Sequence, residues 1–113
     1  MHELSIASNL MDIVKQTVDG QNVSRVTSLL IVIGEMSTVV PDCLTFAFEI
    51  MSKGSVAEGA RLEFERKPLI GKCGDCGRES HIENYVFLCP ECESRNIEIL
   101  SGREFMLKSI ECE

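Results

Sequence analysis

The sequence predicts an α+β fold in which two helices and three strands form one domain, with a small cysteine-rich module inserted near its end. Three observations predict it: helical spacing of apolar residues in two segments, strand-like patterns in three, and two Cys-x-x-Cys pairs ahead of the last strand. The helical segments are residues 4–18 and 41–54, and the strand segments are residues 23–33, 60–67 and 104–111. Because a strand follows the module, we expect it to rejoin the first sheet. The first domain then comprises residues 1–68 and 103–113, and the module residues 69–102.

Both predicted helices are amphipathic. In the first, apolar residues recur every three or four positions before Asp19-Gly20 ends the helix; they are Leu4, Ala7, Leu10, Met11, Val14 and Val18. The second begins at Pro41 and Asp42, which suit a first helical turn, and ends by Gly54. Its expected inner face consists of Leu44, Ala47, Phe48 and Met51. Cys43 in the same helix is expected to be a small buried apolar side chain.

The three predicted strands differ in their patterns. Residues 23–33 are rich in β-branched residues and almost continuously apolar, which favours a strand buried on both faces. Residues 60–67 alternate, with Leu62 and Phe64 on one side and charged residues on the other, and Pro68 stops the strand. Residues 104–111 return to a strand pattern. The sequence therefore predicts one central strand and two less buried ones.

Composition limits the function classes. The chain has 113 residues, no Trp and a formal net charge of −7, which disfavours nucleic acid and anionic membranes as partners. The N-terminus shows no signal-peptide pattern, and no apolar run reaches the roughly 18 residues that span a bilayer. We therefore expect a cytoplasmic protein, in which cysteines stay reduced unless a metal binds them. A monomer or weak homodimer is expected.

Four of the six cysteines form a compact pattern, in which Cys73-x-x-Cys76 and Cys89-x-x-Cys92 are separated by twelve residues. Two such pairs predict a tetrahedral Zn(II) site with four thiolate ligands and no open position, and therefore a structural role. Gly77 follows the first pair and permits a left-handed turn, whereas Glu93 occupies that position after the second. Two disulfides or a redox-active pair remain the alternative. Strands at residues 82–88 and 96–100 complete the layout of a zinc ribbon.

The chain begins Met1-His2-Glu3, which offers a second kind of metal site. His2 is not small, so we expect Met1 to be retained. The amine of Met1, the amide and imidazole of His2 and the amide of Glu3 can supply four nitrogen donors in a plane, which suits Ni(II) or Cu(II) better than Zn(II). A solvated histidine without a ligand role is the alternative. The Glu3 carboxylate either contacts the imidazole or simply favours the helix N-terminus.

These features together resemble the HypA/HybF family of nickel metallochaperones for nickel–iron hydrogenase maturation. The residues that support the resemblance span the chain: Met1-His2-Glu3-Leu4-Ser5, Ile33-Gly34-Glu35, Phe46-Ala47-Phe48-Glu49, the four module cysteines and Lys108-Ser109-Ile110-Glu111. The resemblance implies an α+β nickel-binding domain, with two helices on a small mixed sheet, and a zinc-ribbon domain. It implies nickel at Met1, His2 and Glu3, zinc at Cys73, Cys76, Cys89 and Cys92, and delivery with a partner GTPase to the hydrogenase large subunit. Some relatives also serve urease.

Two other classes fit less well. A nucleic-acid adaptor built on the zinc ribbon is disfavoured because residues 69–102 contain three basic and six acidic residues. An enzyme is disfavoured because the predicted zinc site is closed and the chain has only two histidines. Some relatives have a histidine immediately beside a cysteine pair. Here the second histidine, His81, adjoins neither pair, and we expect a solvated residue at a strand end. Cys112 is expected to be an inconsequential free thiol.

Overall fold

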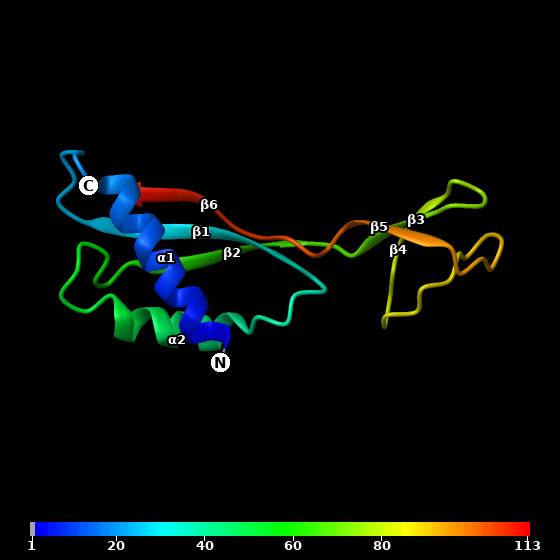
Figure 1. Cartoon of the computed structure of the whole chain (residues 1–113), viewed down its shortest axis with the longest axis horizontal. Coiled ribbons are helices and arrows are strands. Elements are labelled where there is room, and N and C mark those ends of the chain that lie inside the picture. Colours follow the sequence, from blue (N-terminus) through cyan, green and yellow to red (C-terminus); the bar gives the residue numbers. More distant parts are fainter. Residues whose placement is uncertain (1) are drawn as a thin grey trace. The chain divides into compact units, whose positions relative to one another are not determined.

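The computed structural model describes residues 2–113, with side chains from residue 3 onward. Its elements are α1 (His2–Val18), β1 (Val26–Gly34), α2 (Pro41–Met51), β2 (Arg61–Lys67), β3 (Ile70–Cys73), β4 (Glu79–His81), β5 (Ile97–Ser101) and β6 (Phe105–Cys112), as Figure 1 shows. None of the helices in this part of the chain is long and apolar enough to cross a membrane.

The chain divides into two compact units. The first unit comprises Met1–Ile31, Thr38–Glu65 and Met106–Glu113, and the second comprises Val32–Ser37 and Arg66–Phe105. The predicted domain boundaries, 1–68 with 103–113 against 69–102, stay a prediction, because compactness does not test which residues fold independently.

The expected α+β class, with two helices and a small mixed sheet, is confirmed. The first sheet has the order β2-β1-β6. In Figure 1, β1 and β2 run in the same direction and β6 runs opposite to them. β6 returns beside β1 as expected: the Ser24 amide donates to the Glu113 carbonyl, and the Glu113 amide donates to the Arg25 carbonyl, each at 2.8 Å. The central position of β1 explains why all but two of its residues are buried.

The core of the first unit confirms most of the predicted helix faces and corrects three residues. Its members from α1 and α2 are Ala7, Leu10, Met11, Val14, Leu44, Ala47 and Phe48. Leu4 and Met51, both expected inside, are exposed by 41% and 37%. Cys43 is also exposed, so the expectation of a small buried side chain is wrong. These three lie near helix ends or on the flank of α2, where the helical period alone does not say how far the neighbouring elements extend.

The second unit contains an antiparallel sheet of order β4-β3-β5. β5 confirms the strand expected at 96–100, but the strand expected at 82–88 is wrong, because β4 ends before it. Residues 83–86 instead form a tight turn. Asn84 and Tyr85 have φ of 53° and 58°, and the Val86 amide donates to the Glu83 carbonyl at 3.0 Å. Positive φ at both central residues defines a type I′ turn, which the apolar run around it did not indicate.

Two glycines allow a close backbone approach within the second unit. A Cβ at Gly34 would collide with the carbonyl of Gly102, which itself has φ of 115°. The Gly102 carbonyl also accepts a hydrogen bond of 2.8 Å from the Met36 amide. The residues just after β1 are therefore held against the connection from β5 to β6 by contacts that tolerate no side chain.

Candidate metal centre

The first cysteine pair forms a turn at the end of β3. The amides of Asp75 and Cys76 donate to the sulfur of Cys73 at 3.4 and 3.5 Å. The Cys73 amide donates to the Arg78 carbonyl at 2.8 Å, and the Gly77 amide donates to the Cys73 carbonyl at 2.9 Å. Gly77 has φ of 79°, the left-handed conformation that the sequence predicted for it. The turn thus directs backbone dipoles at a sulfur atom that can carry negative charge.

The second pair repeats the same turn. The Glu91 amide donates to the Cys89 sulfur at 3.4 Å, the Glu93 amide to the Cys89 carbonyl at 2.9 Å, and the Cys89 amide to the Ser94 carbonyl at 2.9 Å. Glu93 has φ of 60°. The second turn therefore adopts the left-handed conformation without glycine, at a cost that an L residue normally avoids.

Replacing Glu93 by glycine should stabilise this turn. Glycine removes a left-handed penalty of roughly 1–2 kcal/mol but loses more chain entropy, so we expect a net gain of about 1 kcal/mol in the free energy of unfolding. Chemical denaturation of the zinc-loaded protein measures it. The matched control is the reverse change, Gly77→Glu, which should lose about 1 kcal/mol net, because it gains the same strain and the same entropy advantage and nothing lies within 4 Å of a Cβ there. Equal stability of all three proteins would contradict the argument.

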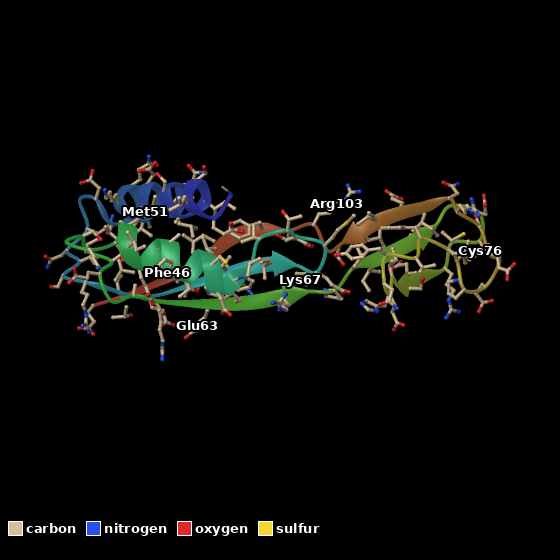
Figure 2. All side chains as sticks on the ribbon, turned by 90° about the horizontal axis from the view of Figure 1, so that it is seen from below. Phe46, Met51, Glu63, Lys67, Cys76 and Arg103 are labelled. Atoms are coloured by element: carbon tan, nitrogen blue, oxygen red, sulfur yellow. The ribbon has the colours of Figure 1, made fainter. Side chains whose placement is uncertain are left out.

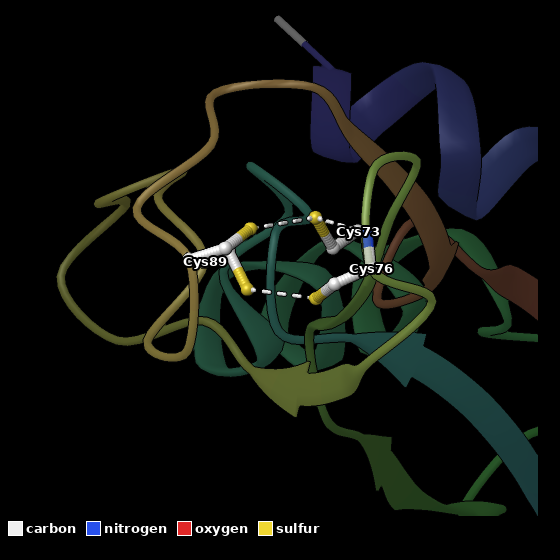
Figure 3. A group of neighbouring side chains, drawn as sticks. Cys73, Cys76 and Cys89 are labelled. Carbon is white, nitrogen blue, oxygen red and sulfur yellow. Dashed lines mark hydrogen bonds between the residues drawn. The ribbon is translucent and has the colours of Figure 1, made fainter.

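The two turns bring the four sulfur atoms together. The Sγ atoms of Cys73, Cys76, Cys89 and Cys92 all lie within 4.8 Å of one another. Two sulfur–sulfur contacts join the turns, Cys73 with Cys92 and Cys76 with Cys89, each at 3.5 Å. Figure 3 labels Cys73, Cys76 and Cys89 of this cluster. A tetrahedral Zn(II) ion with Zn–S bonds of about 2.3 Å sets its sulfurs roughly 3.8 Å apart. The cluster has nearly this size, whereas a disulfide needs about 2.05 Å.

Backbone hydrogen bonds favour the thiolate form of the first cysteine of each pair. The amide of Cys76, followed by that of Asp75, lowers the pKa of Cys73 to about 6 against the opposing effect of burial. The amide of Cys92, followed by that of Glu91, likewise lowers the pKa of Cys89. Both side chains are buried, at 1% exposure. Hydrogen bonds to the charged form thus outweigh desolvation, as a thiolate ligand requires.

The second cysteine of each pair differs from the first. The Arg78 amide favours the thiolate of Cys76, but the hydrogen bond with Cys89 and burial outweigh it and raise the pKa of Cys76. The Ser94 amide acts in the same way on Cys92, and the hydrogen bond with Cys73 together with burial raises that pKa to about 12. In each close sulfur pair, one thiol therefore has a lowered pKa and the other a raised pKa. A divalent cation that replaces the thiol protons relieves the repulsion between the thiolates.

Side chains outside the cluster connect the two turns. Arg78 forms an ion pair with Glu91 at 2.6 Å, and the Ser94 hydroxyl donates to the Asp75 carboxylate. Both connections link a residue of the first turn to one of the second. Because they are exposed, they orient the turns more than they stabilise them.

The other predicted metal ligands lie at the start of the chain. Met1 lies outside the described residues, and so does the side chain of His2, whose backbone begins α1. The amide of Glu3 lies in the first helical turn, where amides have no intrahelical acceptor. The Glu3 carboxylate accepts a hydrogen bond of 3.4 Å from the amide of Val40. Val40 is the N-cap residue of α2 and makes no side-chain cap of its own, so Glu3 links the starts of the two helices.

His81 and Glu35 form a contact that the sequence did not predict. Nε2 of His81 lies 2.8 Å from Oε1 of Glu35, and the same oxygen accepts a hydrogen bond of 3.0 Å from the Leu69 amide. Nδ1 of His81 lies 3.7 Å from Glu83. His81 is exposed and ends β4, as expected, but its contact with Glu35 is an addition to that expectation. Glu35 follows a glycine at the end of β1, but no local signal pairs it with a histidine 46 residues later.

This contact should make stability depend on pH. The hydrogen bond with Glu35 raises the pKa of His81, and the Leu69 amide followed by His81 lowers the pKa of Glu35. The His81 contribution is complete below its unfolded pKa of about 6.5 and is lost as pH rises through the higher folded value. The Glu35 contribution is lost only when the solution becomes acidic enough to protonate the carboxylate.

We expect the stability difference between wild type and His81→Gln to shrink from pH 6 to pH 8.5. Thermal unfolding of zinc-loaded protein at both values measures it, and comparison at equal pH cancels effects on the zinc thiolates. Glu83→Gln is the control for the weaker Nδ1 contact and should retain most of the dependence. A stability difference between wild type and His81→Gln that is independent of pH would contradict a contribution from the charged His81–Glu35 pair.

The fold and the cysteine cluster define the class of this protein. It is a small α+β protein with a four-cysteine module whose geometry suits a tetrahedral metal ion. Comparison with known proteins gives the particular family.

A family model described as "Hydrogenase/urease nickel incorporation, metallochaperone, hypA" matches residues 1–112. The hydrogenase maturation factor HypA of Aquifex aeolicus is 42% identical over 113 residues, covering 100% of this chain and 98% of that one. Its counterpart in Geobacter sulfurreducens is 36% identical over 113 residues, covering 100% of both. This chain therefore belongs to the HypA family.

Solved structures agree on the fold. A solution structure of a HypA protein superposes with a TM-score of 0.75 at 26% identity, covering 100% of this chain and 97% of that one. The solution structure of the nickel metallochaperone HypA from Helicobacter pylori gives a TM-score of 0.65 at 23% identity, covering 97% and 96%. The protein is accordingly a hydrogenase maturation factor of the nickel metallochaperone type and not an enzyme.

Proposed function

We propose that this protein carries Ni(II) at its N-terminus and delivers it, with a partner GTPase, to the hydrogenase large subunit. The observation that supports this most strongly is the family match over residues 1–112, which includes the Met1-His2-Glu3 start and all four module cysteines. The family description also names urease, so urease is the alternative recipient of the nickel.

The proposed nickel ligands are nitrogen atoms. The amine of Met1, the amide and imidazole of His2 and the amide of Glu3 would form a planar set that favours Ni(II) and Cu(II) over Zn(II). The Glu3 amide is free of intrahelical hydrogen bonding because it lies in the first turn of α1. The Glu3 carboxylate already accepts from the Val40 amide, which favours a backbone role for this residue at nickel.

The proposed zinc site is structural. Cys73, Cys76, Cys89 and Cys92 fill four tetrahedral positions, so no position remains for a substrate or for exchange. The two sites then have different tasks. The zinc ion holds the two turns of the module together, whereas the nickel site lies at the chain terminus, where contacts with a partner can displace its ligands and release the ion.

Titration of the zinc-loaded, untagged protein with Ni(II) tests the proposal, with retention of Met1 confirmed by mass spectrometry. We expect one bound equivalent and the yellow d–d absorption of a square-planar, nitrogen-ligated ion. Acidification through the histidine range should weaken binding, because the imidazole and the amides must lose protons. A protein that binds zinc but no nickel would contradict the proposal.

A further inference from the structure

Helix α2 has two apolar stripes, and only one of them is buried in the core. Leu44 and Phe48 are fully buried. Cys43, Phe46 and Ile50 form the second stripe, the outer stripe, at the helical spacing i, i+3 and i+7 on a different side of the helix. Phe46 is 64% exposed and Ile50 is 50% exposed (Figure 2 labels Phe46). An exposed phenylalanine within a regularly spaced apolar stripe is typical of helical recognition surfaces.

The outer stripe borders a hollow between α1 and α2. The hollow has a volume of about 510 Å³ and is lined by Glu3 and Leu4 of α1 and by Cys43, Phe46 and Ile50 of α2, among others. The exposed Leu4, which the helical pattern placed in the core, belongs to this surface. The volume lies within the range of ligand pockets, and five of the seven lining residues are apolar, the other two being acidic. It can receive one or two large apolar side chains.

The charge at the hollow is of one sign. Its two charged lining residues are Glu3 and Asp42. α2 contains Asp42 and Glu49 but no lysine or arginine, and the basic residue of α1, Lys15, lies in its last turn. A complementary partner therefore presents lysine or arginine beside its apolar side chains. A second copy of this chain fits poorly, because it would oppose acidic residues to acidic residues at a net charge of −7 each.

We infer that this hollow receives an apolar, basic segment of the partner protein that takes part in nickel transfer. The inference rests on the proposed function, because the hollow lies beside the proposed nickel site and this position is the reason to expect a partner in nickel transfer. Glu3 and Leu4 line the hollow and directly follow His2 in the chain. The Glu3 carboxylate also contacts the Val40 amide at the start of α2. A segment bound there touches the proposed nickel-carrying turn, so docking and nickel affinity are coupled reciprocally.

The test uses a fluorescein-labelled synthetic amphipathic helix with leucine on one side and lysine and arginine on the other. A second peptide has glutamate in place of the basic residues. Fluorescence anisotropy with the full, zinc-loaded chain should show binding of the basic peptide only. Phe46→Ser and Ile50→Ser should each weaken it about ten-fold or more. Asp42→Asn should weaken it less and reduce its salt dependence.

Val86→Ser is the matched control. Val86 is 57% exposed, similar to Phe46 and Ile50, but lies in the second unit. Its replacement should leave peptide binding unchanged. Equal affinity of wild type and Phe46→Ser would overturn the inference, because only unspecific charge attraction would remain. A wild-type dimer that Phe46→Ser dissociates in sedimentation velocity would also overturn it, with a second copy as the occupant.

Nickel titration of the same variants separates the two proposals. Phe46→Ser should bind one equivalent of Ni(II) as wild type does, because its side chain supplies no proposed ligand. If wild type binds nickel but not the basic peptide, the docking surface alone is wrong. If wild type binds the peptide through Phe46 but no nickel, the nickel-carrying function is wrong.

Discussion

Substitution of His2 by alanine is expected to abolish stoichiometric Ni(II) binding while leaving zinc content and fold unchanged. The imidazole is the only side-chain donor in the proposed planar set, and its loss removes the chelate ring that joins it to the His2 amide. Loss of a residue that merely orients a ligand costs about 10–100-fold in metal affinity, so loss of the ligand should cost more. Nickel titration by absorption spectroscopy, with zinc measured on the same sample, provides the readout.

The chain supplies a matched control for this substitution. His81 is the other histidine of the sequence, and it contacts Glu35 in the second unit. His81→Ala removes an imidazole of the same chemistry and should retain one equivalent of nickel with the same spectrum. If His2→Ala binds nickel as tightly as wild type, the N-terminal site is wrong. If His81→Ala alone loses nickel, the second unit holds the ion instead.

Substitution of Cys73 by serine is expected to remove the zinc ion and unfold the module around it. Cys73 is buried, its sulfur accepts two amide hydrogen bonds, and it lies 3.5 Å from Cys92. Structural zinc sites contribute roughly 10–16 kcal/mol of apparent binding free energy in zinc-finger peptides, which is as large as the whole stability of a typical domain, about 5–15 kcal/mol. The module has few large buried side chains of its own, so little remains to hold it together.

Zinc content by mass spectrometry and a two-dimensional amide spectrum measure the result. We expect zinc to fall to near zero and the amides of residues 69–102 to lose dispersion, while those of α1 and α2 keep it. Cys43→Ser and Cys112→Ser are the controls, because both thiols are exposed and outside the cluster. Full zinc occupancy in Cys73→Ser would show that the four-thiolate site is assigned incorrectly.

The features that depend on local spacing could be predicted from the amino-acid sequence. The three- and four-residue recurrence of Ala7, Met11 and Val14 gave the buried face of α1. The apolar run of β1 gave the central strand. The two Cys-x-x-Cys pairs gave a metal-sized cluster, because each pair forms its own turn and its backbone hydrogen bonds lie within a few residues of the sulfur.

Features that depend on residues far apart in the chain became visible only in the folded structure. It placed His81 against Glu35 and brought Gly34 to the backbone of Gly102. It also showed that Glu93 adopts a left-handed conformation although it is not glycine. The outer stripe of α2 is the clearest case. Helical periodicity shows that Phe46 shares a face of α2 with other apolar residues. Its burial depends on whether another element covers that face, and in the described chain none covers it fully.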